Sequence, residues 1–143
     1  MTIPSHLEAI ADAVRGVGET DARVVAVYLF GSQANGSATA ESDVDLGILF
    51  DSRVGIADRV RLEARFAEAL SKKVDLVDVG HCNAFLALAV ISGERLFCTN
   101  IVACDEFELY VMRRAGDLAP FERERRRMLL TPDSSVLTSR QHP

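Results

Sequence analysis

The chain has 143 residues, 48% of them hydrophobic and 26% charged, which is the composition of an ordinary globular protein and the length of one domain. Its net charge of −5 has the wrong sign for a protein that coats nucleic acid, so direct nucleic-acid binding is disfavoured. No apolar run approaches a membrane span and the N-terminus lacks a signal-peptide pattern, so we expect a cytoplasmic protein with no membrane partner.

The first part of the chain alternates between a helix and strands. Apolar residues recur every three or four positions near the N-terminus and predict a helix over 5–16. A β-branched apolar run predicts a buried strand over 23–30. Residues 31–42 are rich in Gly, Ser, Ala and Asn, which predicts a loop, and a second strand follows over 43–50.

The second part continues the alternation and ends in a long helix. The predicted elements are a helix over 56–70, a short strand over 74–79, an apolar helix over 83–91, an edge strand over 95–98 and a helix over 104–130. This order predicts an α/β fold, a small mixed β-sheet with packed helices. We expect one domain over 1–130 that includes the C-terminal helices, and a flexible tail over 131–143.

The polar residues with the strongest functional pattern surround the first loop. Gly31-Ser32 ends one strand, and Asp43-x-Asp45 opens the next after a ten-residue gap. Side chains two residues apart share a face of a strand, so Asp43 and Asp45 would project together. Two close carboxylates repel unless a cation lies between them, and Mg²⁺ prefers such oxygen ligands. Gly31 would let backbone N–H groups approach a phosphate, and Ser32 would add a hydroxyl donor.

A third carboxylate, Asp75, lies in an otherwise apolar strand, where an unpaired charge is costly to bury. If the strand over 74–79 pairs beside that over 43–50 in matching register, Asp75 completes a cluster able to hold two metal ions for phosphoryl transfer. Asp75 could also accept a proton from an attacking hydroxyl. Asp78, three residues further on, is predicted to be a surface residue on the opposite face.

Other residues have structural interpretations first. The odd number of cysteines, with no Cys-x-x-Cys pair, favours reduced buried thiols over a disulfide framework; they are Cys82, Cys98 and Cys104. Tyr28 is predicted in the core, and a core position is also the safer prediction for Tyr110, although it could face a partner. Arg123–Arg127 is about equally a solvated helix face or a docking surface for a partner protein.

Residues 28–46 resemble the nucleotidyltransferases of the DNA polymerase beta type, whose pattern is Gly-Ser, a ten-residue gap, Asp-x-Asp and a later Asp on a neighbouring strand. The small size, the strand over 73–77 and the Gly93–Phe97 stretch before a long charged helix are similar to the minimal nucleotidyltransferases, in particular the MntA antitoxins. The resemblance covers roughly residues 5–130.

This resemblance implies a polymerase beta-like nucleotidyltransferase fold and a Mg²⁺-dependent protein adenylyltransferase. Members of the antitoxin family transfer AMP from ATP to a tyrosine of a cognate HEPN-type ribonuclease toxin, HepT, and so neutralise it. Carried over onto matching positions, Gly31 and Ser32 would bind nucleotide phosphate, and three carboxylates would bind two Mg²⁺ ions and carry out catalysis. These carboxylates are Asp43, Asp45 and Asp75.

Two other functions stay open at this point. A nucleotidyltransferase acting on a small-molecule hydroxyl, such as that of an aminoglycoside, usually has an added acceptor domain, for which the chain is short unless a second subunit supplies it. A non-catalytic antitoxin would mask its partner by binding alone. An Asp43→Ala protein that still binds but no longer neutralises its partner would exclude that binding function.

Overall fold

The computed structural model describes residues 5–36 and 42–130, and only the backbone of Ser5, Asn35 and residues 121–130. The elements in chain order are α1 (Ser5–Gly18), β1 (Val24–Phe30), α2 (Ser32–Asn35), β2 (Val44–Phe50), α3 (Ile56–Leu70), β3 (Val74–Asp78), the 3₁₀ turn η1 (Val79–His81), α4 (Ala84–Ile91), β4 (Glu94–Cys98) and α5 (Ile101–Leu130). The tail predicted over 131–143 lies outside the described residues.

Within the described residues, the strands form one mixed sheet in the order β3-β2-β1-β4. β1 pairs antiparallel with β2 on one side and with β4 on the other, whereas β2 and β3 run parallel. A parallel pair needs a crossover connection, and α3 provides it between β2 and β3. β3 and β4 are therefore the two edges of the sheet.

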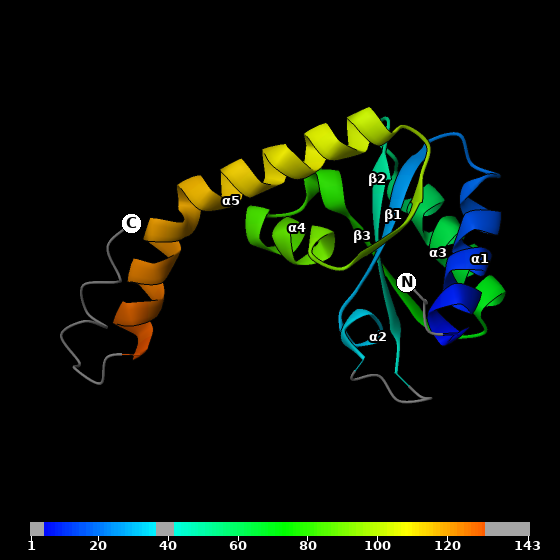
Figure 1. Cartoon of the computed structure of the whole chain (residues 1–143), viewed down its shortest axis with the longest axis horizontal. Helices are drawn as coiled ribbons and strands as arrows, with labels where there is room; N and C mark the ends of the chain where they lie inside the picture. Colours follow the sequence, from blue (N-terminus) through cyan, green and yellow to red (C-terminus); the bar gives the residue numbers. More distant parts are fainter. Residues whose placement is uncertain (1–4, 37–41, 131–143) are drawn as a thin grey trace.

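Helices cover both faces of this sheet, α1 and α3 on one face and α4 with the first part of α5 on the other (Figure 1). Because side chains alternate along a strand, β1 contributes to both layers. Val27 and Leu29 pack in the layer of α1 and α3, while Ala26 and Tyr28 pack in the layer of α4 and α5. This two-sided burial explains why β1 is a continuous apolar run in the sequence.

The α/β fold with a small mixed sheet that the sequence predicts is confirmed. The helix predicted over 56–70 has those bounds, and the other predicted boundaries agree within a few residues. The segment 31–42 differs from its prediction as a loop, because it contains the four-residue helix α2. α2 ends at Gly36, which has a φ of 79° and makes the tight turn that a left-handed C-cap requires.

The last helix begins earlier than the predicted range of 104–130, because Asn100 caps it. The backbone N–H of Ala103 donates to Asn100 Oδ1 at 3.1 Å, which satisfies a free donor of the first turn. Over 101–120, where the side chains of α5 are described, its buried positions recur at helical spacing and are Cys104, Val111 and Ala115. Tyr110 lies off this stripe and is 52% exposed, so its predicted core position is wrong.

α5 continues beyond the layer of α4 and the sheet (Figure 1), and Pro120 lies within it. The cluster Arg123–Arg127 belongs to this part, and its side chains lie outside the described residues. Among the described helices, none combines the length and apolar character needed to cross a bilayer.

Candidate active site

The predicted site residues come from the adjoining ends of three strands. The parallel register places Asp45 of β2 opposite Asp75 of β3, and the antiparallel register places Phe30, the last residue of β1, opposite Asp45. Gly31 follows Phe30 directly. Because in-register residues of neighbouring strands point to the same face, Asp45 and Asp75 project together beside the turn at Gly31. The matching register on which a three-carboxylate cluster depends is the register that the structure has.

Asp43 lies just before β2 and is exposed. The backbone N–H of Val44 donates to the carbonyl of Lys73 at 2.9 Å, so the pairing of β2 with β3 extends to the residue that follows Asp43. Lys73 Nζ lies 3.9 Å from Asp43 Oδ2, an ion pair between two exposed groups. Asp43 is thus balanced in part by a cation of the chain that sequence analysis did not consider.

Electrostatic crowding is strongest at Asp45. Burial raises the pKa of this carboxyl above its ordinary value, and repulsion from Asp75 and then from Asp43 raises it further. Asp75 and Asp43 therefore both act on Asp45, and the charged form of Asp45 is less favoured in the folded protein than in a free carboxyl group.

Asp75 is exposed, so the cost of burying an unpaired charge in an apolar strand does not arise at this position. The reason is the place of β3 at the edge of the sheet, which leaves this end of the strand open to solvent. The exposure makes Asp75 accessible to a second substrate. The strand register, and not a burial cost, therefore supports Asp75 as a candidate site residue.

Within the described residues, no three His, Cys, Asp or Glu side chains converge closely enough to hold a metal ion. Carboxylates without a cation between them repel and spread apart, so an open arrangement is expected for the protein alone. The candidate ligands are all carboxylate oxygens, and a nearby cation would favour the charged form of Asp45. Such oxygen ligands fit a hard divalent cation such as Mg²⁺. The strand register brings the carboxylate-bearing positions together, while their side chains do not converge on one point.

Gly31 makes the closest approach to these carboxylates. Its φ of 73° and ψ of −150° belong to a region that essentially glycine alone adopts. A Cβ at this position would collide with the Oδ2 atom of Asp45. Gly31 is thus required by both backbone conformation and space, and it presents its backbone directly to the carboxylate. Ser32 follows as the first residue of α2 and is half-buried.

Gln33 is a positioning residue that the sequence analysis missed. Its side chain is buried, and Nε2 donates to the backbone carbonyl of Ser42 at 3.3 Å. This hydrogen bond ties α2 to the segment immediately before Asp43, so it links the Gly-Ser turn to the carboxylates. The available signal was one long amide side chain among residues that are mostly small.

A cleft of about 230 Å³ opens beside Gly31. A Cβ on Gly93 would collide with the carbonyl oxygen of Leu29, so a glycine here lets the α4–β4 turn close onto the end of β1. The cleft is smaller than a typical pocket for a whole ligand and suits one part of a nucleotide or acceptor. Its lining residues are Phe30, Gly31, Ala34, Ala89, Ser92, Gly93 and Glu94.

Asp78 is not the surface residue that was predicted. It is buried, and its Oδ2 lies 3.0 Å from Nδ1 of His81, because the chain turns into η1 at this point and folds His81 back. Asp78 lies at the opposite end of β3 from Asp75, so it takes no part in the candidate site. It lines a separate cleft of about 490 Å³ that also includes Arg53 and Arg59.

Comparison with known proteins assigns the chain to a family. A family model described as polymerase beta, nucleotidyltransferase matches residues 14–101, which run from α1 to the start of α5. A curated relative, the protein adenylyltransferase MntA of Shewanella oneidensis (strain MR-1), is 28% identical over 104 residues, 72% of each chain.

Solved structures extend the likeness to the fold. A crystal structure of a toxin-antitoxin with AMP-PNP has a TM-score of 0.68 and 23% identity, and the match covers 83% of this chain and 94% of the other. A tri-AMPylated HEPN toxin of Shewanella oneidensis in complex with an MNT antitoxin has a TM-score of 0.63 and 21% identity over 87% and 95% of the two chains. At these identities the two structures establish a shared fold.

Proposed function

The chain belongs to the polymerase beta nucleotidyltransferase family, and from this premise we propose that it is an antitoxin that transfers AMP from ATP to a tyrosine of a HEPN-type toxin. The transfer depends on Mg²⁺ and neutralises the toxin. The observation that carries this proposal is the register that pairs Asp45 with Asp75 next to Gly31. A cytosolic location, in which both ATP and a ribonuclease toxin are present, remains a prediction.

Three carboxylates would hold the metal: Asp43, Asp45 and Asp75. When bound, Mg²⁺ supplies charge stabilisation for the phosphates of ATP and for the leaving pyrophosphate. Two features of the chain support this assignment. Asp45 has a raised pKa that a cation would reverse, and Asp43 and Asp45 approach the phosphate-binding turn from the same strand end.

Gly31 and Ser32 would bind the phosphates of ATP. Without a Cβ at Gly31, the backbone of the turn lies close to the carboxylates, so a phosphate held there would also contact the metal-binding residues. Gln33 keeps this turn at a fixed distance from the segment before Asp43. The cleft beside Gly31 has room for another part of the nucleotide or for the acceptor side chain.

Asp75 would accept the proton of the attacking tyrosine hydroxyl, and its exposure at the sheet edge makes it reachable from solvent. The tyrosine oxygen forms a bond to the α-phosphorus of ATP, the bond between that phosphorus and the bridging oxygen breaks, and pyrophosphate leaves. The toxin then carries AMP on its tyrosine.

The relatives support the choice of acceptor. The curated relative is named a protein adenylyltransferase, and one of the structures with the same fold contains an AMPylated HEPN toxin bound to its antitoxin.

The test is to purify the tagged protein from its native host together with whatever co-elutes, and to measure the intact mass of the partner. We expect AMP-sized mass increments with the wild type and none with an Asp43→Ala/Asp45→Ala variant that still binds the partner. Asp51→Ala, at the far end of β2, is the matched control and should leave the increments unchanged.

The other outcomes correspond to the two alternative functions. A partner that co-elutes unmodified with both forms would contradict group transfer and leave binding alone as the function. If no protein co-elutes, labelled ATP with a panel of small hydroxylated acceptors tests the small-molecule nucleotidyltransferase, and transfer to one of them would overturn the proposed protein acceptor.

A further inference from the structure

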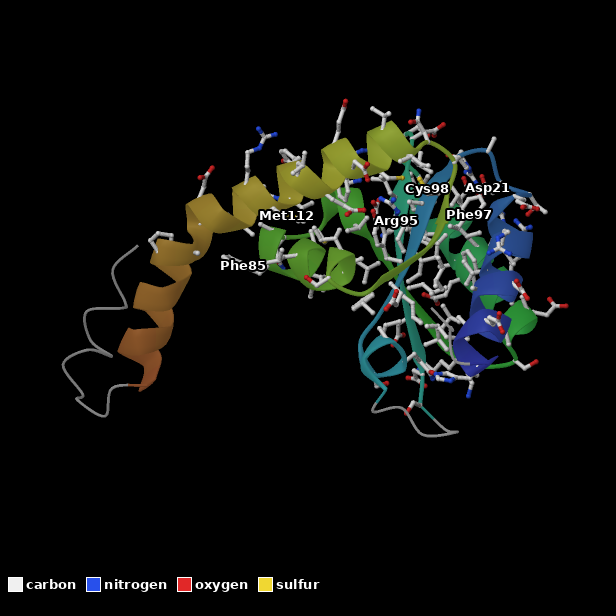
Figure 2. The ribbon with its side chains drawn as sticks, viewed as in Figure 1. Asp21, Phe85, Arg95, Phe97, Cys98 and Met112 are labelled. Carbon is white, nitrogen blue, oxygen red and sulfur yellow. The ribbon has the colours of Figure 1, made fainter. Side chains whose placement is uncertain are left out.

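Two of the three cysteines meet where β4 passes under the base of α5. Cys98 is the last residue of β4, and Cys104 lies in the first turn of α5. Their Sγ atoms are 2.6 Å apart, within about 0.6 Å of the S–S bond length of a disulfide. Figure 2 shows Cys98 beneath the first turns of α5 and Phe97, its neighbour in the strand, on the side of α1.

The backbone between the two cysteines is held in place, so their proximity is built into the fold. The N–H of Thr99 donates to the carbonyl of Val25 at 2.8 Å, which extends the pairing of β4 with β1. The N–H of Cys104 donates to the carbonyl of Asn100 at 3.0 Å, and the side chain of Asn100 caps α5. Formation of a bond between the sulfur atoms therefore needs no rearrangement of the chain.

The two thiols differ in accessibility. Cys104 is fully buried, and burial together with its hydrogen bond to Cys98 raises the pKa of its thiol to about 12. Cys98 is half-buried. A small oxidant dissolved in water would reach Cys98 first. Cys104 would then be the second thiol, which reacts with the oxidised Cys98.

We propose that Cys98 and Cys104 are a redox-active thiol pair that a small peroxide converts into an intramolecular disulfide. The sulfur of Cys98 attacks one peroxide oxygen, the O–O bond breaks, and a sulfenic acid and one water are formed. The sulfur of Cys104 then displaces the hydroxyl group, which leaves as a second water when the S–S bond forms. Two thiols are oxidised by two electrons in total, and hydrogen peroxide is reduced to two waters.

The disulfide would fix the base of α5 to the sheet. In the reduced protein, polar contacts close to the cysteines hold this joint. Glu108 Oε2 accepts from the hydroxyl of Tyr28 at 2.7 Å and from Nη1 of Arg95 at 2.7 Å, and Arg95 Nη1 also donates to Asp105 at 3.0 Å. A covalent bond beside these contacts makes the attachment of α5 independent of ion pairs, and therefore of salt.

Cys82 provides the internal control. Its Sγ lies 3.6 Å from the carbonyl of Val79 and 3.5 Å from that of Asn83, so it contacts backbone oxygens at the start of α4. The pairing of Cys98 and Cys104 predicts that oxidation of the folded chain spares Cys82.

The experiment treats the folded full-length protein with hydrogen peroxide, alkylates the remaining thiols with iodoacetamide and maps them by mass spectrometry. We expect the free thiols to fall from three to one, Cys82, in a monomer that dithiothreitol restores. Cys82→Ala should still form the disulfide, and Cys98→Ala should not. Retained circular dichroism of both variants shows that they fold.

Alkylation of all three thiols after peroxide, a disulfide that contains Cys82, or a dimer linked through Cys98 would each overturn the proposal. A second measurement tests the effect on α5. Amide hydrogen exchange in the first turns of α5 should be slower and less dependent on salt in the oxidised protein. Equal exchange in the two forms would contradict the proposed fixing of α5.

Discussion

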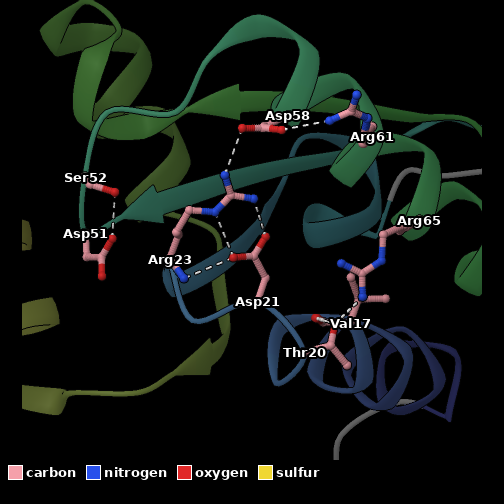
Figure 3. Close-up of polar contacts among 9 residues, drawn as sticks. All are labelled: Val17, Thr20, Asp21, Arg23, Asp51, Ser52, Asp58, Arg61 and Arg65. Carbon is pink, nitrogen blue, oxygen red and sulfur yellow. Dashed lines mark hydrogen bonds and ion pairs between the residues drawn. The ribbon is translucent and has the colours of Figure 1, made fainter.

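The two ends of the β1–β2 pair carry charges arranged in opposite ways. At the end where β1 begins, Arg23 donates to Asp21 at 2.9 Å and to Asp58 at 3.0 Å, and Asp58 also accepts from Arg61 (Figure 3). The hydrogen bonds from Arg23 hold the pKa of Asp21 below its ordinary value, even though partial burial opposes this. This end pairs unlike charges and stabilises the fold.

At the end where β1 finishes, like charges lie together. Asp45 has a raised pKa because of burial and of repulsion from Asp75 and Asp43, and Gly31 holds a backbone conformation that other residues avoid. The same two strands thus have one end where every carboxylate named is paired with an arginine, and one where, among the ion pairs of the described residues, only Asp43 has a cation, Lys73, close by. Departures from local stability rules concentrate where a protein performs chemistry, which supports our proposal that the crowded end is the functional one.

The largest expected effect is on group transfer. Asp43→Ala or Asp45→Ala should lower the rate of AMP transfer by about 100-fold or more, because each removes a carboxylate that stabilises the reacting phosphates through the metal. The rate is measured as label transferred from ATP to the partner. Asp21→Ala, at the paired end, should leave the rate unchanged; equal losses from both ends would contradict the division between them.

Gly31→Ala should cost both stability and activity. The backbone conformation disfavours alanine, and the new methyl group would collide with Asp45, so we expect a loss of about 2 kcal/mol in the free energy of unfolding. Urea denaturation measures it. Gly16→Ala in α1 is the matched control, since a Cβ there meets no atom and should be neutral or stabilising. A Gly31→Ala protein as stable as the wild type would show that the turn is unstrained.

Addition of Mg²⁺ should stabilise the crowded end, because a cation between the carboxylates removes their repulsion. At ten times the dissociation constant, the free energy of unfolding should rise by about 1.4 kcal/mol, measured by thermal or chemical denaturation. Asp45→Asn should show a smaller rise or none. An equal rise in wild type and variant would place the cation elsewhere on the molecule.

The smallest expected effect is at the paired end. Asp21→Ala should lower the free energy of unfolding by about 1 kcal/mol at neutral pH, because it removes the hydrogen bonds from Arg23. Since folding lowers the pKa of Asp21 from 3.8, this contribution is complete above that pH and is lost as the pH falls further. Denaturation of wild type and variant at several pH values measures it. A difference that persists in strong acid would not come from this carboxylate.

Local patterns in the sequence were sufficient to predict the turn and the first two carboxylates of the site. Gly31 directly follows one predicted strand, and Asp43 and Asp45 begin the next. The two-residue periodicity of a strand then places Asp43 and Asp45 on the same face. The helix over 56–70 was predicted from apolar residues at helical spacing, and the structure ends it at Ser71, which has a φ of 53°.

The features that were not predicted depend on contacts between segments far apart in the chain or on the order of strands. Asp75 is exposed because β3 is an edge strand, and no local pattern reveals strand order. The hydrogen bond of Gln33 to Ser42 needs the folded loop, and the contact of Cys98 with Cys104 needs β4 and α5 to pack.

One measurement tests the central claim, that like charges at the end of β1 oppose folding until a cation binds. It compares the free energy of unfolding of wild type and Asp45→Asn in the absence of divalent cations. Because the pKa of Asp45 is raised in the folded state, its stability contribution is present at low pH and lost as the pH rises through that pKa. Asp45→Asn should therefore be more stable than the wild type at neutral pH, with the difference shrinking in acid. A variant that is equally stable or less stable at neutral pH would contradict the account.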